Sequence, residues 1–103
     1  MKEQLTANIA VPDVFQEDIN RAVKILKEGG CTEIYLFGSG VTEKVRNESD
    51  IDLAVRGCPQ GNFFHLLGQL LWELDRPADL VDLDAPDAFA QYLQKEGVLL
   101  RVG

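Results

Sequence analysis

Six residues in the middle of the chain constrain its fold most strongly. Residues 50–55 have the sequence Asp-Ile-Asp-Leu-Ala-Val, in which polar or small side chains alternate with large apolar ones. Because neighbouring side chains of a strand point to opposite faces, this alternation predicts a half-buried strand with Asp50 and Asp52 side by side on its polar face. Dividing 103 residues would leave two parts too small to bury a core. We therefore expect a single domain spanning residues 1–103, with residues 1–11 as an N-terminal extension.

Periodicity and glycine or proline positions indicate the other elements. Helices are indicated where apolar residues recur every three to four positions, and strands where short β-branched or aromatic runs occur. The expected helices span residues 13–28, 62–74 and 84–96, and the expected strands span residues 32–37, 50–55 and 78–83, with a small strand or packed extension at 98–102. This order, α-β-β-α-β-α, favours an α/β chain of the α+β type, with a small mixed sheet and helices packed on one face. The other face is then free to carry polar chemistry.

The composition argues against several classes of protein. Seventeen Asp and Glu against ten Lys and Arg give a net charge of -7. A general nucleic-acid binder needs a basic face, which this balance does not favour. No apolar run is long enough for a membrane span and no secretory signal is visible, so we expect a cytoplasmic protein. Cys31 and Cys58 lack metal-ligand spacing, and free thiols are favoured over a disulfide.

The paired carboxylates at positions 50 and 52 carry the clearest chemical signal. In one patch they repel, and each raises the pKa of the other unless a cation lies between them. Hard divalent cations, Mg²⁺ above all, suit such oxygen ligands. A third carboxylate would complete a two-metal site. The strand at 78–83 offers Asp79 and Asp82, and alternation alone does not decide between them.

A second signal precedes the carboxylates by ten residues. Gly38 and Ser39 follow a predicted strand and open a polar segment. Glycine allows close backbone approach, and exposed N–H groups with a serine hydroxyl suit a phosphate. A triphosphate at Gly38 and Ser39 would lie beside a metal ion held by the carboxylates, which is the arrangement that phosphoryl or nucleotidyl transfer needs.

Together these motifs resemble the minimal nucleotidyltransferases of the DNA polymerase β superfamily. The signature of that family is Gly-Ser, ten residues, Asp-x-Asp, and a later strand of the type Val-Asp-Leu-Val-Asp-Leu. The resemblance covers about residues 15–102, and the register of the later strand implies Asp79 as the third carboxylate. The matching segments are Phe37-Gly38-Ser39, Ser49-Asp50-Ile51-Asp52-Leu53-Ala54-Val55 and Arg76-Pro77-Ala78-Asp79-Leu80-Val81-Asp82-Leu83.

The resemblance implies an enzyme that transfers a nucleoside monophosphate, AMP from ATP in particular, to an acceptor hydroxyl. Asp50 and Asp52 would hold two Mg²⁺ ions, and Asp79 would bind the ion that activates the attacking hydroxyl. Gly38 and Ser39 would hold the β- and γ-phosphates.

Position 40 departs from the family pattern, which commonly has Arg after Gly-Ser where this chain has Gly40. Lys44 and Arg46 remain to contact the triphosphate. Single-domain members of the family often pair with a helical HEPN-type protein as antitoxin and toxin, and studied antitoxins adenylylate a tyrosine of the toxin. The implied partners are therefore ATP and a small helical HEPN-type protein.

The helix at 62–74 predicts a partner surface. His65, Gln69 and Trp72 fall on the side opposite its core stripe, and an exposed Trp is a favoured interface anchor. We expect this side to contact a helical protein or a second copy of the chain, unless residues 1–11 cover Trp72. The residues expected in the core are Phe63, Leu67, Leu70, Leu71 and Leu74.

A rival hypothesis is an interaction module that neutralises its partner by binding alone. The acidic composition suits a basic, nucleic-acid-cleaving partner, and Gly40 is consistent with weakened catalysis. The two hypotheses differ in whether a variant lacking the carboxylates of Asp50 and Asp52 still neutralises the partner.

Overall fold

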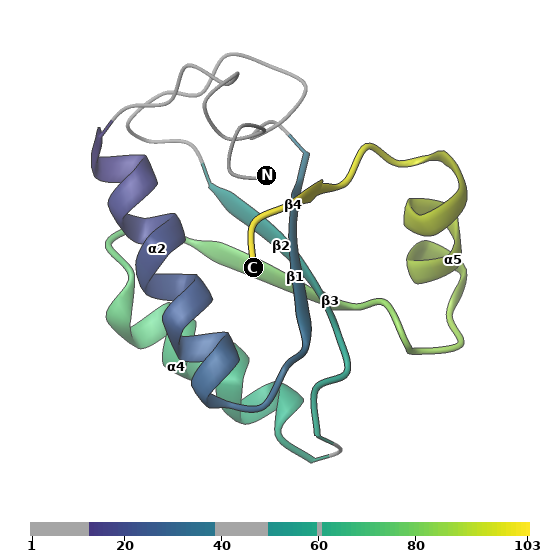
Figure 1. Ribbon diagram of the computed structural model, residues 1–103, viewed down its shortest axis with the longest axis horizontal. Helices are drawn as coiled ribbons and strands as arrows, with labels where there is room; N and C mark the ends of the chain where they lie inside the picture. Colours follow the sequence, from purple (N-terminus) through teal and green to yellow (C-terminus); the bar gives the residue numbers. More distant parts are fainter. Residues whose placement is uncertain (1–12, 39–49, 60) are drawn as a thin grey trace.

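The computed structural model describes residues 13–38, 50–59 and 61–103. Figure 1 shows helices α2 (Asp13–Glu28) and α4 (Phe63–Glu73) on one side of the sheet and helix α5 (Ala88–Glu96) on the other side. The predicted order of elements is confirmed, and the tail adds a short strand. The elements are α2 (Asp13–Glu28), β1 (Glu33–Phe37), β2 (Ile51–Arg56), α4 (Phe63–Glu73), β3 (Ala78–Asp82), α5 (Ala88–Glu96) and β4 (Leu100–Arg101).

The four strands form one mixed sheet in the order β3-β2-β1-β4. Strand β1 is antiparallel to β2 and to β4, whereas β3 runs parallel to β2. The parallel pair is possible because α4 connects β2 to β3 as a crossover. The α+β class with a small mixed sheet is therefore confirmed.

The main core lies between the sheet and the helices α2 and α4. The apolar members of the 50–55 alternation, Ile51, Leu53 and Val55, are fully buried there. They pack in one cluster with residues such as Phe15 of α2 and Leu70 of α4. Burial of the apolar face of β2 fixes the opposite face as the side that carries Asp52.

Helix α4 presents a different core stripe from the one that periodicity predicted. Leu66, Leu70 and Leu74 are buried, whereas Leu71 is 54% exposed. The prediction that Leu71 belongs to the core is wrong, because the buried stripe follows positions four apart and leaves position 71 on the outer side.

Helix α5 lies on the face opposite α2 and α4 (Figure 1), which differs from the expected packing on one face. Its Leu93 joins a second buried cluster with Phe37 of β1, Ala54 of β2 and Leu83. The physical reason is that this face is polar only at one end. Further along it carries apolar side chains that need cover, and α5 supplies that cover while leaving the aspartate end of the face open.

The cysteines differ from the expected free thiols, because Cys31 and Cys58 are disulfide-bonded, with their Cα atoms 3.9 Å apart. The antiparallel register pairs Glu33 with Arg56, so the residues two positions beyond each also face one another. The sequence spacing of 27 gave no sign of this, because strand pairing brings the two positions together.

Within the described ranges, no helix is long and apolar enough to cross a membrane.

A buried ion pair joins α2 to the segment that leads into β3. The Nε of Arg76 donates to Oδ2 of Asp18 at 2.8 Å, and both side chains are almost fully buried. The guanidinium also lies 4.9 Å from the ring centroid of Phe15. This contact fixes the chain three residues before Asp79.

Candidate active site

The sheet register brings Asp52 and Asp79 together as direct neighbours on adjacent strands. Asp52 pairs with Asp79 of β3 on one side and with Phe37 of β1 on the other. Ala78 and Leu80, which flank Asp79, are buried. Because side chains alternate along a strand, Asp79 points to the open face, as Asp52 does. Asp50 lies exposed immediately before β2.

Asp82, the alternative third carboxylate, has a different place. It is half-buried at the end of β3, and its Oδ1 accepts a hydrogen bond from the backbone N–H of Asp84 at 2.9 Å. Asp82 lies three positions after Asp79 on β3, so the two side chains point to opposite faces of the strand. The structure therefore groups Asp79, and not Asp82, with Asp52.

The pKa of Asp52 reflects its burial and the charges of the two neighbouring carboxylates. Burial raises the pKa of Asp52 above its ordinary value, and the nearby charges of Asp79 and Asp50 raise it further. Within the described residues, no Lys, Arg or His forms an ion pair with any of the three. Like charges held together without a cationic partner favour either protonation or a bound cation.

The donor chemistry of this group fits Mg²⁺. Mg²⁺ prefers oxygen ligands and is commonly bound through one or two carboxylates together with substrate phosphates. Among the side chains that the structure describes, no three His, Cys, Asp or Glu residues converge into a ready-made metal site. Asp52 and Asp79 supply neighbouring carboxylates, so the remaining ligands would come from Asp50 and the substrate.

Gly38, at the end of β1, lies against Asp52. Its φ is +73°, and a Cβ at this position would collide with the Asp52 carboxylate. Only glycine combines that backbone conformation with the available space. The predicted phosphate-binding residues Ser39, Lys44 and Arg46, together with Gly40, lie outside the described residues.

An aromatic side chain that the sequence reasoning missed lies beside this end of the sheet. The ring of Phe89 on α5 packs edge-on against Phe37, with centroids 6.3 Å apart, and remains half exposed. It also stacks on Tyr92, with centroids 6.4 Å apart. The spacing of these two aromatic residues marks one face of α5, but only the tertiary structure places that face near Asp52.

The predicted partner surface on α4 is open. Trp72 is 87% exposed, and His65 is exposed as well. Gln69 is half-buried, and its Nε2 donates to Oε2 of Glu73 at 3.3 Å. The exposure of Trp72 agrees with the sequence-based expectation, and the contact with a partner remains a prediction. Residues 1–11, which were the alternative expected to cover Trp72, lie outside the described ranges.

Comparison with known proteins places this geometry in a family. The chain matches the family described as "Polymerase beta, Nucleotidyltransferase" over residues 13–101. No curated protein matches it significantly.

Solved structures are similar over most of the chain. A crystal structure of the toxin-antitoxin MntA-HepT is 31% identical, with a TM-score of 0.56, and the match covers 82% of this chain and 70% of that one. A structure of the toxin-antitoxin with AMP-PNP is 32% identical, with a TM-score of 0.56, over 80% of this chain and 71% of that one. On these matches, the chain belongs to the polymerase β nucleotidyltransferase family as a minimal nucleotidyltransferase.

Proposed function

We propose that this protein is a Mg²⁺-dependent nucleotidyltransferase that moves AMP from ATP to a hydroxyl group of a partner protein, as one half of a toxin-antitoxin pair. The observation that carries the proposal is the placement of Asp52 beside Asp79 on the open face of the sheet, with Asp50 adding its charge to theirs. The similarity to MntA-HepT and to a toxin-antitoxin with AMP-PNP supports the pairing and the nucleotide.

Each residue of the site has a role in this reaction. Asp50 and Asp52 would hold two Mg²⁺ ions, and Asp79 would share the ion nearest the acceptor. When bound, these ions lower the pKa of the attacking hydroxyl and neutralise the leaving pyrophosphate. Asp79 orients the hydroxyl for in-line attack, because it lies at the exposed side of the pair.

The bond changes follow from that arrangement. The acceptor oxygen attacks the α-phosphorus of ATP, the bond to the β-phosphate breaks, and pyrophosphate leaves with that electron pair. The hydroxyl proton passes to solvent. The backbone at Gly38 lies against the Asp52 carboxylate, so a phosphate chain that contacts this glycine would lie beside the carboxylate rather than between the two. From the resemblance, Ser39, Lys44 and Arg46 would complete the contacts to the triphosphate.

The direct test is label transfer from α-labelled ATP. The protein is incubated with Mg²⁺ and an extract of its own host, and the Asp50→Asn/Asp52→Asn variant serves as the inactive form. We expect label on one macromolecule with the wild type and none with the variant. The Asp75→Asn variant is a matched control, because Asp75 is an exposed carboxylate on the loop after α4. Full transfer by the double variant would disprove the metal assignment.

A second function, neutralisation by binding alone, is favoured by one observation. The outer side of α4 exposes Trp72 by 87% and Leu71 by 54%, a large apolar area for so small a chain. In that case the Asp50→Asn/Asp52→Asn variant would still neutralise a HEPN-type partner in cells, and Trp72→Asp would not.

A further inference from the structure

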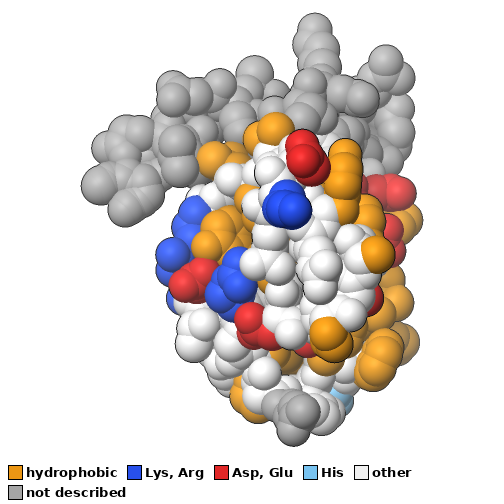
Figure 2. All heavy atoms as spheres, turned by 90° about the vertical axis from the view of Figure 1, so that its right-hand side faces the viewer, with side chains coloured by type: hydrophobic (Ala, Val, Ile, Leu, Met, Phe, Trp, Pro, Cys, Tyr) orange, Lys and Arg blue, Asp and Glu red, His pale blue; other side chains and the backbone are white. Residues whose placement is uncertain are grey.

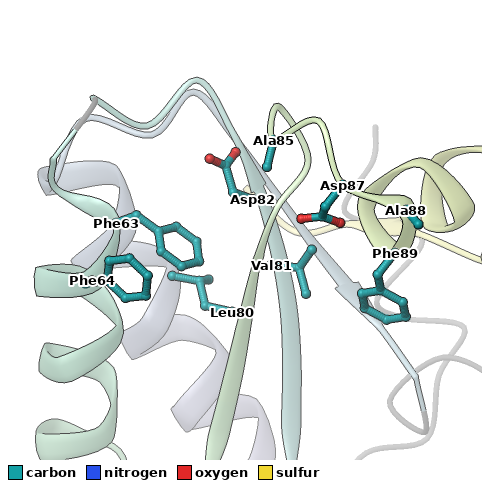
Figure 3. Close-up of a pocket in the computed structure, with 9 residues that line it drawn as sticks. All are labelled: Phe63, Phe64, Leu80, Val81, Asp82, Ala85, Asp87, Ala88 and Phe89. Atoms are coloured by element: carbon teal, nitrogen blue, oxygen red, sulfur yellow. The ribbon is translucent and has the colours of Figure 1, made fainter.

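A pocket of about 650 Å³ lies over the outer edge of β3. Phe63 and Phe64 of α4 line it on one side, and Phe89 of α5 lines it on the other (Figure 3). Leu80 and Val81 also line it, although consecutive strand residues point to opposite faces. A single hollow that contacts both residues must lie over the edge of the strand between them. No pattern in the sequence predicted this pocket.

The edge of β3 has unpaired backbone groups. β3 is the last strand of the sheet and pairs only with β2. The carbonyl of Pro77 accepts from Ile51, and the N–H of Leu83 donates to Val55. Since alternate residues of a parallel strand bond to the same neighbour, Leu80 directs its N–H and C=O outward. In the described part of the chain nothing pairs with these two groups, and such an edge can accept an added strand.

Acidic side chains surround this edge. Asp82 and Asp87 line the pocket itself, and Asp79 lies on β3 one residue before Leu80. Figure 2 shows hydrophobic and acidic side chains interspersed along one side of the face that α5 presents. The net charge of the whole chain is -7. A second copy pairing through its own β3 would bring these aspartates against one another, so the charges favour a basic occupant.

We propose that the open edge of β3 docks the acceptor of the transfer reaction, as an extended segment of the partner protein with two adjacent apolar residues flanked by Lys or Arg. One apolar side chain fits against Phe64 and Leu80, and the next fits against Val81 and Phe89. The docked residue opposite Asp79 points to the same face as Asp79, so a hydroxyl there faces the carboxylates. This inference rests on the proposed function, because it supplies the acceptor for that reaction.

The test selects peptides from a displayed library of random ten-residue sequences against the protein carrying Asp50→Asn and Asp52→Asn. This variant makes recovery depend on binding and not on transfer. We expect selected peptides to share adjacent apolar residues with basic flanks. Their affinity should fall about tenfold or more for Phe64→Asp and for Phe89→Asp, because each variant removes an aromatic wall of the pocket.

The matched control is Trp72→Asp, which removes an even more exposed aromatic residue from the same helix as Phe64. It should leave the affinity unchanged. In the complex with a selected peptide, hydrogen exchange at the amide of Leu80 should slow. Peptides that lack the pattern, an absence of binders, or binders sensitive to Trp72→Asp but not to the two pocket variants would overturn the docking site.

Failure of docking and failure of the proposed function give different results. If wild-type protein transfers label and the Phe64→Asp/Phe89→Asp variant transfers it equally well, the docking site is wrong and the enzyme assignment stands. If no label is transferred but selected peptides bind as expected, the docking site stands and the transfer reaction is wrong.

Discussion

At the scale of single residues, the site depends on Asp52, a carboxylate whose ionised form is disfavoured by its surroundings. Asp52 lies between Phe37 and Asp79 in the sheet, and the backbone of Gly38 lies against its carboxylate. Burial and two neighbouring negative charges disfavour its ionised form. Functional sites often retain such groups, because the same environment that destabilises a lone carboxylate strengthens its attraction for a cation.

The stability of the protein should therefore improve when Asp52 is neutralised. The folded-state pKa of Asp52 lies above its unfolded value, so its ionised form destabilises the fold at neutral pH. That penalty is lost as the pH falls through the folded and then the unfolded pKa. We expect Asp52→Asn to have a higher Tm than the wild type at pH 7, with the difference closing towards about pH 3.

Calorimetric scans across this pH range, without divalent metal, measure the effect. Asp75→Asn is the control for a change of charge elsewhere. A lower Tm for Asp52→Asn at pH 7 would contradict the account. Added Mg²⁺ should raise the Tm of the wild type more than that of Asp52→Asn, since a ligand stabilises the state that binds it.

At the scale of elements, α5 both covers the second core cluster and lines the pocket. Asp87 is its N-cap, with extended backbone, and its Oδ1 accepts from the N–H of Ala90 at 2.7 Å. Only Ala90 and Leu93 of this short helix are buried. Its stability therefore depends strongly on the cap, because helices of this length are marginal alone.

We expect Asp87→Ala to lower the free energy of unfolding by about 1 kcal/mol. Asp87→Ser is the control, because a serine hydroxyl can accept the same hydrogen bond without the charge. Urea denaturation of the three proteins measures the difference. Equal losses for Ala and Ser would mean that the charge of Asp87, and not its capping bond, stabilises α5.

At the scale of the whole molecule, the ion pair of Asp18 and Arg76 joins α2 to the segment that leads into β3, across 58 residues of sequence. Both side chains are almost fully buried. The Asp18 carboxylate also accepts a hydrogen bond from Nη1 of Arg21 at 3.2 Å, and removing one member of a buried ion pair is strongly destabilising.

Asp18→Ala should therefore destabilise the protein by roughly 3–5 kcal/mol. Asp18→Leu combined with Arg76→Met should recover much of that loss, because it replaces both buried charged groups with apolar side chains of similar volume. Chemical denaturation of both variants gives the comparison. If the single and double variants were equally unstable, packing of the Arg76 side chain, and not the buried charge, would be the cause.

Much of the fold could be predicted from local patterns. The alternation at residues 50–55 identified β2 and its buried side, whereas the shared face of Asp50 and Asp52 stays a prediction. Apolar periodicity gave α2 with its observed ends, Asp13 and Glu28. These features depend on residues close in sequence, so the side-chain periods of helix and strand are sufficient to reveal them.

Other features depend on which segments become neighbours, and the sequence carries no local record of that. The pairing of β3 with β2 placed Asp79, and not Asp82, beside Asp52, and the antiparallel pairing of β1 with β2 brought Cys31 to Cys58. Helix α5 packs on the apolar residues of the far side of the sheet, and this packing forms one side of the pocket at β3. The sequence by itself determined the elements and the faces of their side chains, whereas the tertiary structure decided which faces meet, because strand register and helix packing are set by contacts between distant parts of the chain.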